Sequence, residues 1–140
     1  MSDTVSIHKY PAKHLPPQYK SLVFSKWLRS FRFGNPDFEK INSDEYFKHY
    51  HLFIENLMNK PDSVIRLAVL TDDRDVVLGF SVSREDVLDY IHVHRDHRKQ
   101  GIGSMLVPEG TTTFSHITKT ATEIWLKVPR YKKLKFNPFA

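Results

Sequence analysis

The stretch from Val87 to Leu106 constrains the fold of this chain more than any other. It begins with an apolar run typical of a strand, passes through the basic turn Arg98-Lys99-Gln100-Gly101-Ile102-Gly103, and then starts a helical pattern. A helix that follows such a turn directs several backbone N–H groups, which have no acceptor inside the helix, toward one point. The positive end of the helix dipole lies at the same point. The pattern therefore predicts an anion site, and phosphate suits it best.

Two familiar phosphate-binding loops do not fit this turn. The P-loop requires lysine followed by serine or threonine after its second glycine, whereas Gly103 is followed by Ser104 and Met105. The dinucleotide-binding fingerprint requires a third glycine where this chain has Leu106. The turn therefore predicts a phosphate site of another kind.

Composition limits the class of protein. A chain of 140 residues with 40% hydrophobic residues is predicted to form one globular domain over residues 1–140. No stretch approaches the ~20 apolar residues of a membrane-spanning helix. The N-terminus lacks the apolar core of a signal peptide. Without cysteine the chain has no disulfide and no thiolate nucleophile. We therefore expect a cytoplasmic protein with no membrane partner.

The formal net charge of +5 favours anionic partners such as coenzyme phosphates or nucleic acid. The basic residues gather in two stretches, of which the first has no acidic residue between Thr4 and Pro36. Charge runs of this kind are also typical of a solvated surface. The two stretches contain Lys9, Lys13, Lys20, Lys26, Arg29 and Arg32, and then Lys127, Arg130, Lys132, Lys133 and Lys135.

The spacing of apolar residues predicts the order of elements along the chain. A strand over Val5–Tyr10 is followed by a helix from Gln18 that Gly34 ends, and by a second helix from Asn42 to Met58. Next comes a hairpin with its loop at Asp72–Asp75. The remaining predicted elements are the hairpin strands Ser63–Thr71 and Val76–Ser83, the strand Val87–His94, a brief helix after Gly101, the strand Thr111–Ile117 and the helix Thr120–Lys133.

The turn at Gly101 resembles the pyrophosphate-binding motif of the GNAT acyltransferase superfamily, Arg/Gln-x-x-Gly-x-Gly/Ala. Arg98, Gly101 and Gly103 fill its three defined positions. Val93 matches the valine of the preceding Val-x-Pro-x-x-Arg pattern, in which Arg95 replaces proline. The predicted order of elements is also the order of that family. The resemblance implies an α/β, GNAT-like fold: a mixed, mostly antiparallel sheet with helices on both faces and a shortened C-terminus.

Two further segments extend the resemblance. Tyr131–Phe136 resembles the Tyr-x-Lys-Leu-Gly-Phe signature at the end of the family's last helix, with Lys135 in place of glycine. The family normally continues with a two-stranded hairpin after this point. Within the superfamily the chain is most similar to small GNAT-like proteins encoded by tailed bacteriophages, which would place it in the host cytoplasm. That similarity is carried by residues 25–30, 115–118 and 136–138.

The resemblance implies that the protein transfers an acyl group from acetyl-CoA to an amine. The glycine turn would hold the pyrophosphate of the coenzyme, and the edge of the strand at 91–93 would pair with the pantetheine arm. A backbone N–H near Val93 would polarise the thioester carbonyl. The residues implied to contact the coenzyme are Ile91, His92, Val93, Arg98, Lys99, Gln100, Gly101, Ile102, Gly103 and Ser104.

Two proton transfers remain, and each needs a side chain. The resemblance implies that Tyr131 protonates the departing thiolate. For the base that takes the proton of the amine, His116 is the first candidate because imidazole ordinarily titrates near neutral pH. Asp89 is a further candidate, and His92 and Glu85 lie nearby in sequence. Asp89 and His92 have opposite parity on one strand, so they cannot both face the substrate.

In the GNAT fold the first two helices and the loop between them select the acceptor. This region is basic and aromatic here, and we expect Trp27, Arg29, Arg32 and Tyr50 to contact the substrate. Aromatic residues at helical spacing are equally typical of a core. The acceptor is a small molecule, a protein or a nucleic acid, and the chain could form a homodimer. The alternative is a GNAT-fold module that binds or modifies nucleic acid through its basic stretches.

Residues 92–97 carry a third alternative. They spell H-x-H-x-D-H, the metal-binding signature of metallo-β-lactamase-like hydrolases, and imidazole and carboxylate are ordinary zinc ligands. That fold takes further ligands from a much longer chain, whereas here His116 is the one histidine that follows the run. The first two histidines would share a strand face with Tyr90 and Leu88, which suits a half-exposed strand without metal. We therefore expect no metal.

Overall fold

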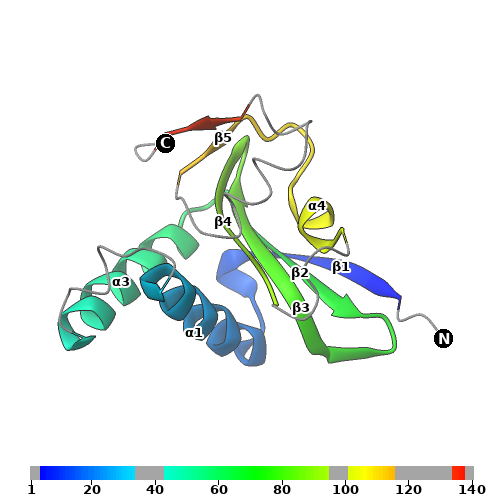
Figure 1. Cartoon of the computed structure of the whole chain (residues 1–140), viewed down its shortest axis with the longest axis horizontal. Helices are drawn as coiled ribbons and strands as arrows, with labels where there is room; N and C mark the ends of the chain where they lie inside the picture. The colour runs from blue at the N-terminus through cyan, green and yellow to red at the C-terminus, as the bar shows by residue number, and fades with distance from the viewer. Residues whose placement is uncertain (1–3, 34–42, 95–100, 116–133, 138–140) are drawn as a thin grey trace.

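The computed structural model describes residues 4–33, 43–94, 101–115 and 134–137 (Figure 1). The elements alternate much as the apolar spacing predicts. In chain order they are β1 (Val5–Pro11), the 3-10 helix η1 (Ala12–His14), α1 (Pro17–Phe33), α3 (Ser43–Met58), β2 (Ser63–Leu70), β3 (Asp73–Arg84), β4 (Val87–Val93), α4 (Ile102–Leu106), β5 (Thr113–Phe114) and β6 (Lys135–Phe136).

The strands form one six-stranded sheet in the order β1-β2-β3-β4-β5-β6. Neighbouring strands from β1 to β4 are antiparallel, while β5 is parallel to β4 and β6 is parallel to β5. Short turns can join antiparallel strands, but parallel strands need a longer connection. The segments before β5 and before β6, residues 94–112 and 115–134, are long enough for such connections. The predicted mixed, mostly antiparallel sheet is confirmed.

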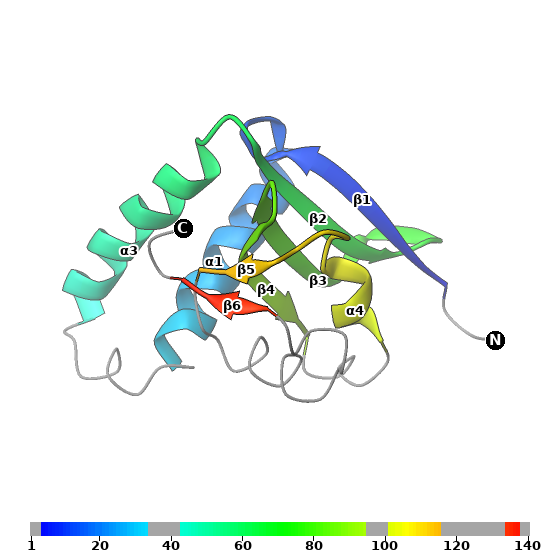
Figure 2. The ribbon, with the colours of Figure 1, turned by 90° about the horizontal axis from the view of Figure 1, so that it is seen from above.

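Helices cover both faces of the sheet, as predicted. Figure 1 and Figure 2 show α1 and α3 on one face and α4 on the other. Each face has its own apolar core. The helix-pair core includes Val23, Trp27, Tyr46, Ile54, Ile65, Leu67, Phe80, Val82 and Tyr90. The α4-side core contains Ala68, Leu78, Leu88, Ile91, Val93, Ile102, Leu106, Val107 and Phe114.

The two long helices form for reasons visible in their sequences. Pro17 begins α1, because proline has no N–H to lose in the first turn and its fixed φ suits a helix. Apolar side chains recur along one stripe of each helix and are buried, including Val23 on α1 and Ile54 on α3. The Tyr46 hydroxyl donates a 2.6 Å hydrogen bond to the carbonyl of Leu28, which ties α3 to α1.

Three predicted boundaries differ from the structure. β3 begins at Asp73, so the predicted loop at Asp72–Asp75 is mostly strand. Lys135 and Phe136, expected at the end of the last helix, form β6 and pair with β5. Of the strand predicted over Thr111–Ile117, the described residues form strand at Thr113–Phe114, and residues 116–117 lie outside the described part. The first two differences arise from pairing with a distant strand, which local spacing does not encode.

The register of the sheet shifts at three points, and two of these shifts are β-bulges of a single extra residue. Ala68 pairs with Gly79 and Val69 with Val77, which leaves Leu78 of β3 without an opposite residue. An extra residue in one strand turns the following side chains to the other face. Leu78 consequently packs in the α4-side core, although Phe80, two residues later, packs in the helix-pair core.

Gly79 lies where β3 and β4 approach each other most closely. A Cβ at this position would come within 2.6 Å of the carbonyl oxygen of His92 and 3.2 Å of Leu106 Cδ1. Because the first contact is with backbone, β4 would have to move. We therefore expect Gly79→Ala to lower the free energy of unfolding by about 1–3 kcal/mol, measured by urea denaturation. An unchanged midpoint and slope would show that the two strands can separate here without loss.

None of the helices in the described part of the chain is both long enough and apolar enough to cross a membrane.

Candidate active site

The turn that joins β4 to α4 has the backbone geometry expected of a glycine turn. Gly101, the residue before α4, has φ 80° and ψ 2°, in the left-handed region that glycine enters without strain. A Cβ placed on Gly101 would have nothing within 4 Å, so the space beside the turn is open. The amides of the first turn of α4 have no acceptor inside the helix. Among the described residues, nothing therefore blocks the space beside Gly101.

The core and two hydrogen bonds hold the two elements on either side of residues 95–100. Ile102 and Leu106 of α4 are buried in the α4-side core. The Ser81 hydroxyl donates a 2.7 Å hydrogen bond to the carbonyl of Leu106, at the end of α4. On the strand side, the amide of His94 donates a 2.7 Å hydrogen bond to the carbonyl of Leu78. The end of β4 and the helix α4 are therefore both fixed to β3.

The two edges of β4 differ in how far they are paired with neighbouring strands. Its edge on the β3 side is paired up to Val93, whereas among the described residues its pairing with β5 covers Val87 and Leu88. Because the amide of His94 points to β3, the alternation of a strand turns the amides of Val93 and Ile91 toward the other edge. The predicted pantetheine-binding edge at 91–93 therefore faces away from β3. The side chains of Ile91 and Val93 are buried on the α4 side.

The second β-bulge lies in β4 itself. Val82 pairs with Tyr90 and Ser83 with Leu88, so Asp89 is the extra residue. Leu88 packs in the α4-side core, while Tyr90 packs in the helix-pair core. The expectation that Leu88 shares a face with Tyr90 and the following histidines is therefore wrong. Its physical reason is the inserted residue, which breaks the period of two.

Asp89, a predicted base, is fully buried in a hydrogen-bonded ion pair. Arg84 donates from Nε to Oδ2 at 2.6 Å and from Nη2 to Oδ1 at 2.8 Å. The hydroxyl of Ser115 donates to Oδ1 at 2.6 Å. The hydrogen bond with Asp89 raises the pKa of the Arg84 guanidinium, although its burial acts in the opposite direction. Asp89 of β4 is thus bonded both to β3 and to the residue after β5.

Sequence reasoning did not identify Arg84 and Ser115 as partners of Asp89. Arg84 and Asp89 flank the tight turn at Glu85 and Asp86, where Glu85 has a positive φ of 47°. A charged pair placed across a predicted hairpin turn was the available signal for Arg84. No local signal indicated Ser115, because it reaches Asp89 from 26 residues away. Ser115 directly precedes His116, the first candidate base.

The predicted substrate residues are placed in different surroundings. Trp27 is fully buried, with its ring stacked on Tyr90 at a centroid distance of 4.7 Å. Tyr50 is half-buried and stacks on Tyr46 at 4.8 Å, and burial raises the pKa of its hydroxyl. Arg29 is exposed, and the side chain of Arg32 lies outside what the structure describes. Trp27 therefore serves the core, which leaves Tyr50 and Arg29 accessible.

Several predicted residues fall outside the described ranges. They include part of the turn and two catalytic candidates, namely Arg98, Lys99, Gln100, His116 and Tyr131. The metal alternative depends partly on Asp96 and His97, which also lie outside these ranges. Within the described ranges, no three potential ligands come together at one point.

Comparison with solved structures shows the fold. A Pyrococcus furiosus protein described as a candidate acetyl transferase is 18% identical, with a TM-score of 0.56, over 95% of this chain and 80% of that chain. YjaB from Escherichia coli, in its apo form, is 21% identical, with a TM-score of 0.49, over 74% of this chain and 62% of that chain. An aminoglycoside N-acetyltransferase in complex with CoA is 12% identical, with a TM-score of 0.43, over 98% of this chain and 77% of that chain.

The sequence matches no family model and no curated protein. The Pyrococcus furiosus match, however, extends over nearly the whole chain and agrees with the mixed six-stranded sheet. The chain therefore has an α/β fold of the GNAT acetyltransferase type. At 18% identity the match establishes the fold alone.

Proposed function

We propose that the protein is an N-acyltransferase that uses acetyl-CoA. The observation that carries this proposal is the open turn at Gly101, which links the bulged strand β4 to α4 on a GNAT-type sheet. The turn contains the spacing Arg98-x-x-Gly101-x-Gly103, and a pyrophosphate needs closely spaced backbone donors of this kind. The pantetheine arm would lie along the edge of β4 that faces away from β3.

The proposed reaction is direct transfer. The lone pair of a neutral amine attacks the thioester carbonyl carbon, and the carbonyl electrons move to oxygen, where a backbone N–H near Val93 stabilises the charge. The oxyanion then re-forms the carbonyl as the carbon–sulfur bond breaks, and the electron pair of that bond leaves with sulfur. A base takes the proton of the amine, for which His116 is proposed. Tyr131 is proposed to protonate the thiolate. Because the acyl group is never bonded covalently to the enzyme, the chain needs no cysteine nucleophile.

The burial of Asp89 supports a different role for it than proton transfer. Its carboxylate oxygens accept hydrogen bonds from Arg84 and Ser115, and the side chain is fully enclosed. A general base must come within hydrogen-bond reach of the amine. We therefore assign Asp89 to positioning: it joins β4 to the residue that precedes His116.

Calorimetry with acetyl-CoA, followed by release of free CoA thiol in the presence of a panel of amines, tests this function. We expect a dissociation constant on the order of micromolar to millimolar, the usual range for enzyme substrates, and thiol release that depends on an amine. Folded protein that does not bind acetyl-CoA would contradict the proposal. Binding without transfer to any amine would retain the coenzyme site and contradict the enzymatic role.

A further inference from the structure

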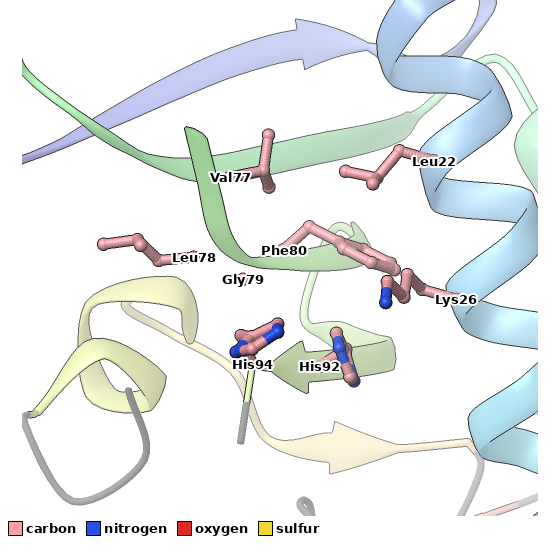
Figure 3. Close-up of a pocket in the computed structure, with 8 residues that line it drawn as sticks. All are labelled: Leu22, Lys26, Val77, Leu78, Gly79, Phe80, His92 and His94. Carbon is pink, nitrogen blue, oxygen red and sulfur yellow. The ribbon is translucent and has the colours of Figure 1, made fainter. Parts of the chain in front are cut away.

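A small pocket lies between α1 and the end of β4, on the face opposite α4 (Figure 3). Figure 3 shows that α1, β3 and β4 all contribute to its wall. Its volume is about 20 Å³. It can therefore receive the end of a ligand but not a whole one. The lining residues are Leu22, Lys26, Val77, Leu78, Gly79, Phe80, His92 and His94.

The pocket wall formed by His92 and Phe80 lies on the opposite face of the sheet from α4. His92 lies against Phe80, with ring centroids 5.6 Å apart, and Phe80 belongs to the helix-pair core. Val93, the next residue, is buried on the α4 side. A coenzyme held at Gly101 and a ligand held in the pocket would therefore approach the end of β4 from different faces. That arrangement places the pocket where the acceptor of the proposed transfer would bind.

The charges around the pocket favour an anion. Among the described residues, its lining contains one ammonium group, Lys26, and two imidazoles, His92 and His94, and no carboxylate. Lys26 is half-buried, and a charge that is partly withdrawn from water interacts more strongly than one in bulk solvent. No residue of α1, on which Lys26 lies, is acidic. An acceptor whose only charged group is an ammonium would be repelled by Lys26.

The same charges would help an amine to react. Attack on the thioester requires the neutral form of the amine, and a nearby positive charge disfavours the ammonium form. The acceptor would still need an attractive group to overcome the repulsion. A carboxylate or a phosphate on the same molecule supplies that attraction, and two imidazole N–H groups can donate to its oxygens.

We propose that the acceptor is a small amine that also carries an anionic group, and that Lys26, His92 and His94 bind that group. The identity of the acceptor rests on the proposed acyl transfer. The existence of an anion site in the pocket does not depend on that reaction. The specificity would lie in the pocket, because only the anionic end of the molecule fits there.

Matched pairs of amines test the substrate class. An amino acid is compared with its amide, and phosphoethanolamine with ethanolamine, at a fixed acetyl-CoA concentration. We expect the anionic member of at least one pair to have a kcat/KM about tenfold higher or more. The pair that shows the effect distinguishes a carboxylate from a phosphate. Lys26→Met is expected to remove the preference, mainly through KM, and to leave acetyl-CoA binding unchanged.

Lys20→Met is the matched control. Lys20 lies on the same helix but is exposed and lines a different pocket, together with Lys13 and Glu55. We expect this variant to keep the wild-type preference. Equal kcat/KM values within both pairs, or a preference that Lys26→Met and Lys20→Met reduce equally, would overturn the assignment of the acceptor.

A titration with inorganic phosphate keeps the inference testable without turnover. We expect phosphate to shift the ring proton signals of His92 and His94 in NMR spectra of the wild type, and to shift them several-fold less in Lys26→Met. If acetyl-CoA does not bind, the proposed function and the acceptor fail, but this shift would still establish an anion site. Absence of the shift in the wild type would overturn the site itself.

Discussion

Replacing Gly101 with glutamate is expected to weaken acetyl-CoA binding about a hundredfold or more, measured by calorimetry. The new side chain enters the open space beside the turn, where the pyrophosphate is proposed to lie, and adds a negative charge there. Gly101 also has φ 80°, so the substitution strains the backbone that presents the amides. A hundredfold loss corresponds to about 2.8 kcal/mol, which the loss of charge-assisted hydrogen bonds can account for.

The control variant Gly110→Glu distinguishes a loss of the coenzyme site from an effect of backbone strain. Gly110 has φ 82°, and a Cβ there also has nothing within 4 Å, so the two substitutions carry the same strain and the same charge. Gly110 lies after α4, in the segment that leads to β5. We expect Gly110→Glu to have the same thermal stability as Gly101→Glu and to bind acetyl-CoA as tightly as the wild type. Equal weakening by both variants would show that the turn at Gly101 does not hold the coenzyme.

Asp89→Asn is expected to lower the free energy of unfolding by about 3 kcal/mol or more. The substitution removes the charge that balances Arg84, whose side chain is only 12% exposed. Breaking a buried ion pair by changing one partner typically costs about 3–5 kcal/mol, because the other charge is left buried and unpaired. Domains are stable by only about 5–15 kcal/mol, so urea denaturation should show a clear shift of the midpoint.

Asp86→Asn is the control for this change. Asp86 is exposed and accepts a 2.7 Å hydrogen bond from Thr112, so the same chemical substitution there should cost no more than about 0.5–1.5 kcal/mol. The double variant Arg84→Met, Asp89→Leu removes both charges and is expected to be more stable than Asp89→Asn. Equal costs for the two asparagine variants would show that the Arg84–Asp89 pair does not stabilise the fold.

Local spacing predicted the parts of the fold that depend on neighbours along the chain. The helical recurrence of apolar residues predicted α1 and α3, because one stripe of each must face the sheet. The turn at Gly101 was predictable from glycine spacing alone, since a left-handed residue before a helix favours glycine. The strand pattern also predicted β2, β3 and β4, although the hairpin loop between β2 and β3 was predicted too long.

The tertiary structure decided what depends on pairing across the sheet. The bulge at Asp89 is a difference of one residue between β4 and β3, and neither strand encodes it alone. That single residue sends Leu88 and Tyr90 to opposite faces and gives Asp89 its partners, Arg84 and Ser115. In the same way Lys135 and Phe136 become a strand because β5 offers an edge to pair with.

The sequence by itself therefore predicted β1 to β4, the two long helices α1 and α3, and a short helix that starts after Gly101. Only the tertiary structure showed that Trp27 is core and that Asp89 is a buried structural anion. It also showed that Lys26 of α1 lines one pocket with His92 of β4 and with His94, the residue that follows β4. The physical reason is distance along the chain. Local conformation follows from adjacent residues, whereas burial and charge pairing are set by residues that only the folded sheet brings together.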